Sequence, residues 1–349
     1  MDGMRIRRLG SDEKQAWDDY VAAHPQALPY HRHAWKDAVE AAYGFEGIYL
    51  VAEEQGRIDG VLPLVLFSWP LLGQRLISLP YCDAGGILAE NESIAARLLA
   101  AARVLAQRPP FSALEIRCGQ PLSGPEGGGG GINKVRMVLD LPQGGDKLMS
   151  GLKAKLRSQI KKPERDGLYA RLGGGELLAE FYAVFAENMR DLGSPVHSRL
   201  WFEEILKAFG QQAAIGVIYS PEGRPAAAGI LLRNGKLACV PWASSLRRFK
   251  HLNPNMLLYW TFLSFAADNG SEKFDFGRST QGEGSWRFKK QWGAEPEPLY
   301  WETFSAEKRW ASNGAAGGKS RRLAEAVWRR LPLETTSYLG PKVRRFISL

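Results

Sequence analysis

The sequence predicts an α+β fold made of two duplicated domains followed by a basic helical tail. The chain has 349 residues, which is long for one core and suits two domains of ordinary size. A series of motifs from the first half recurs in the same order in the second half, and positive charge gathers near the C-terminus. We expect a first domain at 1–147, a second at 148–305 and the tail at 306–349, packed back on the first domain.

The repeat is clearest in two segments, LPYHRHAWKDAVEAAYG and SPVHSRLWFEEILKAFG. Four residues match at a spacing of 166, namely Pro29 and Pro195, His31 and His197, Trp35 and Trp201, and Gly44 and Gly210. Each segment is followed by a hairpin pattern, a strand, a helix (93–107 or 255–269) and a strand that holds Arg117 or Arg278. We favour duplication over shared α/β patterning, and expect 135–141 to close the first half and 297–304 the second.

Composition indicates a folded protein of the cytoplasm. Hydrophobic residues make up 45% and charged residues 24%, as in ordinary globular proteins. The N-terminal segment lacks an apolar stretch of the length that a signal peptide needs, and no apolar run is long enough to span a bilayer. Three cysteines without a CxxC spacing argue against disulfides and zinc, so we expect no metal.

The net charge of +9 lies mostly in the tail. Residues 307–349 hold ten Lys or Arg and three Asp or Glu, which leaves only +2 for the rest of the chain. A basic tail without a basic domain argues against binding to DNA. Within the tail, 319–331 predicts an amphipathic helix whose apolar side contains Leu323 and Val327. We expect this side to pack on the protein, with contact to an anionic membrane surface as the alternative.

Basic residues precede the second half. Leu148, Leu152, Leu156 and Ile160 predict a helix that Pro163 should end or kink. Arg157 and Lys161 recur at the same spacing on a neighbouring face. A basic helix face near a domain junction suits an anionic ligand, whereas most such faces are simply solvated.

A second anion site is suggested by Asn253-Pro254-Asn255. Asn253 suits a helix N-cap and Pro254 the first helical position, and a helix N-terminus such as that at Asn255 attracts anions. Nearby, Trp242 and Tyr259 could line an acceptor groove or belong to the core.

The stretch KFDFGRSTQGEGSWRFKKQWGA carries the most specific signal. The combination of DFGRS with FKKQWGA, together with LRSQIKK, MRDLGSPVHSRLWF, GRPAAAGILL and NPNMLLYW, resembles the FemAB family. The likeness covers about residues 15 to 305 and is nearest to the branch associated with exosortase/PEP-CTERM and exopolysaccharide gene clusters. It implies a fold of two GNAT-like (acyl-CoA N-acyltransferase) domains.

The resemblance also implies site residues. Lys289 matches the family's functional lysine by motif, so we expect it to stabilise charge on the donor or the oxyanion, against the alternative of a surface lysine. Asp275 is the second catalytic candidate; it and Arg278 would orient the loop or contact substrate, or form a structural ion pair. Phe288 and Arg199 complete the expected substrate-binding residues.

Three functions remain open. The first is transfer of an acyl or aminoacyl group to a cell-envelope glycan, a peptidoglycan-type precursor or an exopolysaccharide intermediate, by direct attack on an activated donor. The second is an acetyl-CoA-dependent acetyltransferase of exopolysaccharide, although the glycine-rich loop Q/R-x-x-G-x-G/A is missing. The third is a non-catalytic module that binds glycan or a membrane surface. Expected donors are acetyl-CoA, acyl-CoA or aminoacyl-tRNA, and the expected partner is an anionic glycan or nucleotide-linked precursor, in the cytoplasm or at the inner face of the membrane.

Overall fold

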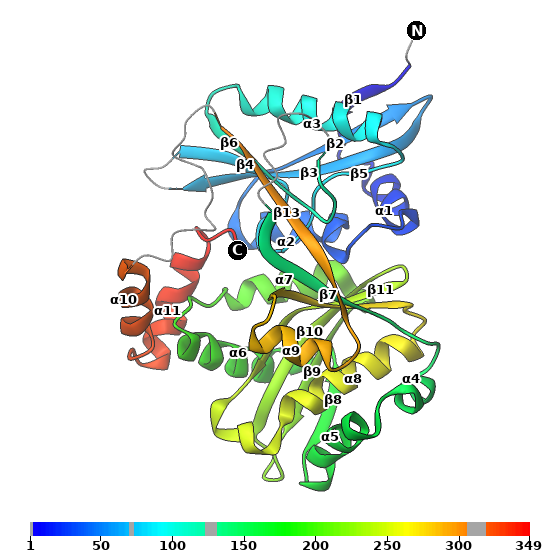
Figure 1. Cartoon of the computed structure of the whole chain (residues 1–349). Helices are drawn as coiled ribbons and strands as arrows, with labels where there is room; N and C mark the ends of the chain where they lie inside the picture. Colours follow the sequence, from blue (N-terminus) through cyan, green and yellow to red (C-terminus); the bar gives the residue numbers. More distant parts are fainter. Residues whose placement is uncertain (1–2, 70–72, 123–130, 306–318) are drawn as a thin grey trace. The chain divides into compact units, whose positions relative to one another are not determined.

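The computed structural model describes residues 3–69, 73–122, 131–305 and 319–349 (Figure 1). The chain divides into two compact units, each drawing on separate stretches of sequence. The first unit comprises 1–135, 297–316 and 346–349, and the second comprises 136–296 and 317–345. Both units contain a mixed sheet with helices, which confirms the predicted α+β class and the duplication.

The first unit has the strand order β1-β2-β3-β4-β6-β13, with β5 beside β3. All its strand pairs are antiparallel except β4 with β6. Helix α3 covers the sheet closely because Gly60 on β3 has no side chain; a Cβ there would lie 2.7 Å from Ile94. The elements are β1 (Arg5–Arg8), α1 (Lys14–Ala23), α2 (His33–Tyr43), β2 (Gly47–Glu54), β3 (Arg57–Trp69), β4 (Gly73–Ile77), β5 (Leu88–Ala89), α3 (Glu92–Ala106), β6 (Phe111–Cys118) and β13 (Glu295–Phe304).

The second unit repeats this plan with the order β7-β12-β11-β10-β9-β8. Among the strand pairs of this unit whose register is described, β11 and β12 pair in parallel and the others are antiparallel. The pair β11 and β12 takes the place that β4 and β6 take in the first unit. The elements are β7 (Gly131–Asp140), α4 (Gly145–Gly151), α5 (Ala154–Arg165), β8 (Tyr169–Gly173), α6 (Leu178–Leu192), α7 (Arg199–Phe209), β9 (Ala213–Tyr219), β10 (Pro225–Asn234), β11 (Leu237–Ser245), α8 (Pro254–Asp268), β12 (Lys273–Thr280), α9 (Gly284–Lys290), α10 (Lys319–Trp328) and α11 (Leu333–Arg344).

Two glycines let α8 pack against the second sheet. Gly216 on β9 and Gly229 on β10 are paired across the strands. A Cβ on either residue would lie within 2.9 Å of the Phe262 ring of α8. The fully buried Phe262 therefore rests directly on the main chain, which fixes α8 and the turn that precedes it.

The closing strands differ from the prediction. β13 pairs antiparallel with β6 of the first unit, with Trp301 opposite Arg117. β7 neighbours β12 instead, and the amide of Leu141, just beyond β7, donates to the Glu272 carbonyl at 2.7 Å. Each unit is thus completed by a strand from the other half of the sequence. Sequence patterns could not show which closing strand pairs with which sheet, because the duplicated units offer equivalent sheet edges to the same kind of strand.

The basic segment before the second unit also differs from the prediction. The expected single helix is broken after Gly151, giving α4 and α5, and α5 continues through the buried Pro163 to Arg165. Proline has no N–H to donate, so α5 loses one main-chain hydrogen bond at Pro163, and the helix ends two residues later.

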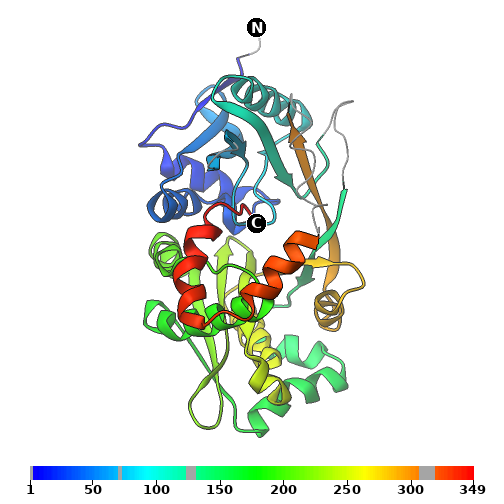
Figure 2. The same ribbon diagram turned by 90° about the vertical axis from the view of Figure 1, so that its left-hand side faces the viewer.

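Most of the tail belongs to the second unit, which corrects the expected packing on the first domain. Figures 1 and 2 show α10 and α11 on the same side of the second unit, near α6. Gly340 of α11 allows this contact, since a Cβ there would lie 2.8 Å from Val196. Of the described tail residues, 346–349 belong to the first unit; residues 306–318 lie outside the described part of the chain.

Candidate functional site

The parallel strands β11 and β12 pair over a short stretch and then separate. Their register runs from Leu237 opposite Lys273 to Cys239 opposite Asp275. Beyond this point β11 continues to Ser245, paired only with β10, and β12 continues to Thr280. The parallel pairing of β11 with β12 therefore ends at Cys239, and the two strands diverge beyond it.

Asp275 and Gly277 shape β12 where the strands separate. Gly277 has φ of 76°, a left-handed conformation that suits glycine. The buried carboxylate of Asp275 accepts a 2.7 Å hydrogen bond from the Gly277 amide and lies 3.5 Å from the guanidinium of Arg136 on β7. Asp275 thus holds the bend in β12 and forms an ion pair with Arg136, which is the structural alternative expected for it.

Lys289 holds the same bend from the other side. Its ammonium donates to the carbonyl oxygens of Gly277 and Arg278, both at 2.9 Å, and only 7% of the residue is exposed. The alternative of a surface lysine is therefore wrong. A buried ammonium needs such acceptors, and the two carbonyls at the end of β12 supply them.

Aromatic rings join these residues to α8. Tyr259 stacks on Phe276 with ring centroids 5.4 Å apart, and Phe288 lies 5.2 Å from Tyr259. Burial raises the pKa of Tyr259 to about 12, so its hydroxyl stays protonated. Asp275, Arg278, Lys289, Phe288 and Tyr259 form one group, which we call the β12–α9 cluster.

The remaining candidates lie elsewhere in the second unit. Trp242 is buried in the core, with its ring edge-on to Trp201 and Phe202, so the core alternative holds for it. Arg157 donates to the Leu152 carbonyl at 2.5 Å and closes the end of α4.

Two basic candidates and Asn255 complete the set. Lys161 is exposed on α5, and Arg199 is exposed at the start of α7, where it pairs with Glu203 at 3.0 Å. Asn255 lies in the first turn of α8 as expected, but the side chain of Asn253 makes no capping bond. The structure therefore brings the motif residues together, whereas the described contacts of Arg157 and Arg199 are with residues outside the β12–α9 cluster.

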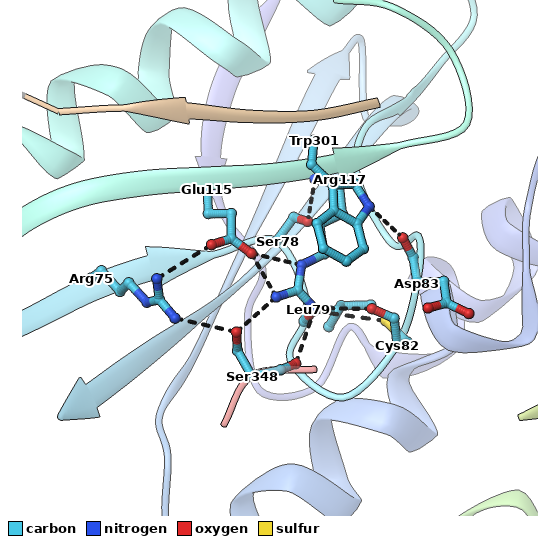
Figure 3. A network of polar contacts seen from close by, with 9 residues as sticks. All are labelled: Arg75, Ser78, Leu79, Cys82, Asp83, Glu115, Arg117, Trp301 and Ser348. Carbon is cyan, nitrogen blue, oxygen red and sulfur yellow. Dashed lines mark hydrogen bonds and ion pairs between the residues drawn. The ribbon is translucent and has the colours of Figure 1, made fainter. Parts of the chain in front are cut away.

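The first unit carries a buried polar network at the matching place (Figure 3). Arg117, the repeat partner of Arg278, is 1% exposed and donates to Glu115 and to the carbonyls of Leu79 and Cys82. Its guanidinium also lies 4.8 Å from the ring centroid of Trp301. Burial alone would raise the pKa of Glu115, but Arg117 and Arg75 outweigh burial and lower it.

The C-terminus completes this network. The carbonyl oxygen of Ser348 accepts from the Tyr81 amide at 2.6 Å and from Arg117 at 3.0 Å. Its hydroxyl oxygen accepts from Arg117 at 2.8 Å and from Arg75 at 3.2 Å. In the first unit the place next to the parallel strand pair is thus filled by the chain itself, whereas the polar groups at the bend of β12 are held by Asp275 and Lys289.

Sequence reasoning missed the Ser348 network. One signal was available, since Glu115 and Arg117 alternate within the strand pattern LEIRC and so share a face of the strand. The part played by Ser348 had no signal, because it depends on a contact across 231 positions. Among the described residues, no group of three or more His, Cys, Asp or Glu side chains is placed to hold a metal ion.

Comparison with known proteins agrees with this geometry. Residues 150–290 match the family model described as an acetyltransferase (GNAT) domain. That match covers the two parallel strands and the β12–α9 cluster. No curated protein matches the chain by sequence.

Solved structures match over most of the chain. FemX superposes with a TM-score of 0.69 at 15% identity, covering 85% of this chain and 96% of that one. A tandem GNAT protein from the clavulanic acid biosynthesis pathway gives 0.56 at 14% identity, covering 87% and 99%. L-PGS from Bacillus licheniformis gives 0.53 at 13% identity, covering 98% of both chains. The chain therefore has the tandem GNAT fold that the sequence predicted.

Proposed function

We propose that this FemAB-like protein of the GNAT superfamily transfers an acyl or aminoacyl group, and that its second unit performs the reaction. One observation carries the proposal: β11 and β12 separate after three pairs, beside a buried lysine and a bent main chain. The acetyltransferase domain match lies over the same residues. The acceptor would be an amine or hydroxyl of a cell-envelope glycan, a peptidoglycan-type precursor or an exopolysaccharide intermediate.

The geometry suits binding of an extended donor along β11. Past Cys239, β11 no longer pairs with β12, so an edge of β11 lies where the two strands diverge. An extended ligand with amide groups can pair with such an edge as an added strand does. Direct attack of the acceptor on the donor's activated carbonyl needs positioning and stabilisation of negative charge.

The β12–α9 cluster divides these tasks. Lys289 and Asp275 bind the main chain of Gly277 and Arg278, so we assign them a positioning role. Arg278 is half-buried at the end of β12, where its charge can contact the donor or the oxyanion. Lys289 would affect the reaction indirectly, because its ammonium fixes the carbonyls of Gly277 and Arg278 and so the position of the Arg278 side chain.

Acetyl-CoA-dependent transfer is the second candidate. It is favoured by the acetyltransferase description of the matched domain. The clavulanic acid pathway protein was solved without AcCoA, which makes a coenzyme A thioester a natural donor to test. The resemblance to the FemAB family makes aminoacyl-tRNA the other donor to test.

Ligand-induced thermal stabilisation tests the proposal. The protein is heated with acetyl-CoA, longer acyl-CoAs, aminoacyl-tRNA and uncharged tRNA. A donor at a hundred times its Kd should raise the free energy of unfolding by about 2.7 kcal/mol. A shift with a thioester supports acyl transfer, and a shift with charged but not uncharged tRNA supports aminoacyl transfer. No shift with any donor contradicts the proposal.

Two neighbouring lysines supply the matched control. Lys289→Met removes the ammonium that holds β12, whereas Lys290→Met removes a half-buried lysine that pairs with Glu295. Each variant is compared with its own ligand-free form. We expect the donor-induced shift to fall strongly in Lys289→Met and to persist in Lys290→Met. Equal shifts would contradict the role of the cluster.

A further inference from the structure

Large apolar side chains on α10 and α11 lie in contact with solvent. Within the described residues, exposed large hydrophobic side chains are Leu323 (67%), Tyr338 (66%), Val327 (53%), Val343 (42%) and Leu339 (38%) on these helices, against Val104, Tyr169, Leu192 and Leu200 elsewhere. The expectation that the apolar side of 319–331 would pack on the protein is therefore wrong for Leu323 and Val327. Leu192 ends α6, where its carbonyl accepts from Arg329 of α10, so it adjoins the same surface.

Each helix has a separate face for packing. On α10, Glu325 and Arg329 lie against the end of α6, because a Cβ on Gly193 would meet Glu325 at 2.8 Å. On α11, Thr336 and Gly340 are buried. Leu323 and Val327 are four residues apart, as are Leu339 and Val343, so each pair shares one exposed helix face.

Positive charge surrounds these apolar faces. Between residues 319 and 345 the sequence has eight Lys or Arg and two Glu, a net of +6 out of +9 for the chain. The described basic side chains of the surface are exposed: Arg321, Arg322, Arg329, Arg330, Lys342 and Arg345. Lys342 also lies 3.7 Å from the ring centroid of Tyr338, which keeps that ring among cations.

We propose that the exposed faces of α10 and α11 form a docking surface for a lipid bilayer with anionic headgroups. Exposed apolar side chains flanked by Arg and Lys are the features with which helices bind such an interface. Charge complementarity decides the occupant, because two copies of this surface would bring +6 against +6 and repel each other. No helix among the described residues is long and apolar enough to cross a membrane. This inference stands independently of the transfer reaction.

Vesicle flotation of the full chain tests the proposal. Vesicles of phosphatidylcholine alone are compared with vesicles that also contain phosphatidylglycerol, at low and high salt. We expect binding to the anionic vesicles only, weakened by salt because the attraction is screened. Equal binding to both vesicles, or no binding, would overturn the proposal.

Paired variants test whether binding depends on this particular surface, and not on the net charge of the protein or on exposed apolar side chains in general. Arg321→Glu with Arg322→Glu should weaken binding to the anionic vesicles about tenfold or more. Lys207→Glu with Lys236→Glu changes the net charge by the same amount at exposed sites elsewhere and should leave binding largely unchanged. Leu323→Ser with Val327→Ser should also weaken binding, whereas Val104→Ser on α3, which is 51% exposed, should not.

The controls also define the contradicting results. An equal loss in the control variants would refute a specific surface. Sedimentation that shows a dimer broken by the Leu323 and Val327 changes, without vesicle binding, would assign the face to a second copy of the chain instead.

Discussion

Arg117 and Ser348 are 231 positions apart in the chain, yet two hydrogen bonds join them, at 2.8 Å to the Ser348 hydroxyl and 3.0 Å to its carbonyl. Arg75 donates to the same hydroxyl at 3.2 Å. The C-terminus is thereby part of the buried interior of the first unit, beside the strand pair β4 and β6. Its counterpart in the second unit, where β11 and β12 separate, has the motif residues instead.

Removing the Ser348 hydroxyl should destabilise the protein. Ser348→Ala leaves donors of Arg117 and Arg75 buried without that acceptor, which costs about 1–3 kcal/mol. Chemical denaturation measures the change, with exposed Ser158→Ala on α5 as the control. A Ser348→Ala protein as stable as the control would show that the network contributes nothing to stability.

The repeat partners Arg117 and Arg278 should respond differently to the same change. Lysine keeps the charge but cannot reproduce the fork of donors, so Arg117→Lys should cost about 3 kcal/mol. Arg278→Lys, at a half-buried position, should cost under about 1 kcal/mol and should instead weaken donor binding. Denaturation and donor titration of both variants check this, and equal costs in stability would refute the asymmetry.

His197 should make stability fall in mild acid. Burial, and then the charge of Arg344, lowers its pKa well below the ordinary value, and its Nε2 accepts from Arg344 at 2.9 Å. In the unfolded chain a histidine takes up a proton below about pH 6.5. The folded state resists that proton, so the stability supplied by neutral His197 is present above pH 6.5 and is lost as pH falls toward the folded-state pKa.

A glutamine variant isolates this contribution. His197→Gln can still accept from Arg344 but does not titrate. Melting temperatures between pH 5 and pH 8 should therefore fall less steeply toward acid in the variant than in the natural protein. Identical slopes would show that His197 does not carry the effect.

Gly229 should be intolerant of even a methyl group. A Cβ there would lie 2.8 Å from the Trp242 carbonyl and 2.9 Å from Phe262, so Gly229→Ala should cost about 1–3 kcal/mol through overpacking. Gly175→Ala is the control, because nothing lies within 4 Å of its Cβ position. Thermal unfolding of both proteins checks the difference, and a tolerated Gly229→Ala would contradict the close approach of α8.

The local patterns predicted the elements and their order well, because hydrophobic periodicity and turn residues act over short distances. The matched series from Pro29 to Arg278 correctly indicated two units of one plan. What the sequence could not supply were long-range choices between equivalent partners. The sequence of β13 does not show whether the strand pairs with β6 or with β12. Likewise, nothing in the sequence around Ser348 predicts its hydrogen bond with Arg117.

At the candidate site, too, the sequence predicted the local motif but not the contacts that its residues make. The motif placed Lys289 and Asp275 together, but only the structure shows that both bind the main chain around Gly277. Exposure likewise required the structure, since the pattern at Leu323 and Val327 fits a packed helix equally well.

Hydrogen–deuterium exchange with and without donor tests the central claim most directly, since it locates binding on the intact chain. The donor that gives the largest thermal shift is used, and peptides are compared between the two units. The account predicts slower exchange in residues 239–246 and 275–291, with no change in residues 73–79 and 111–118. Protection confined to the first unit, beside Arg117 and Ser348, would contradict it.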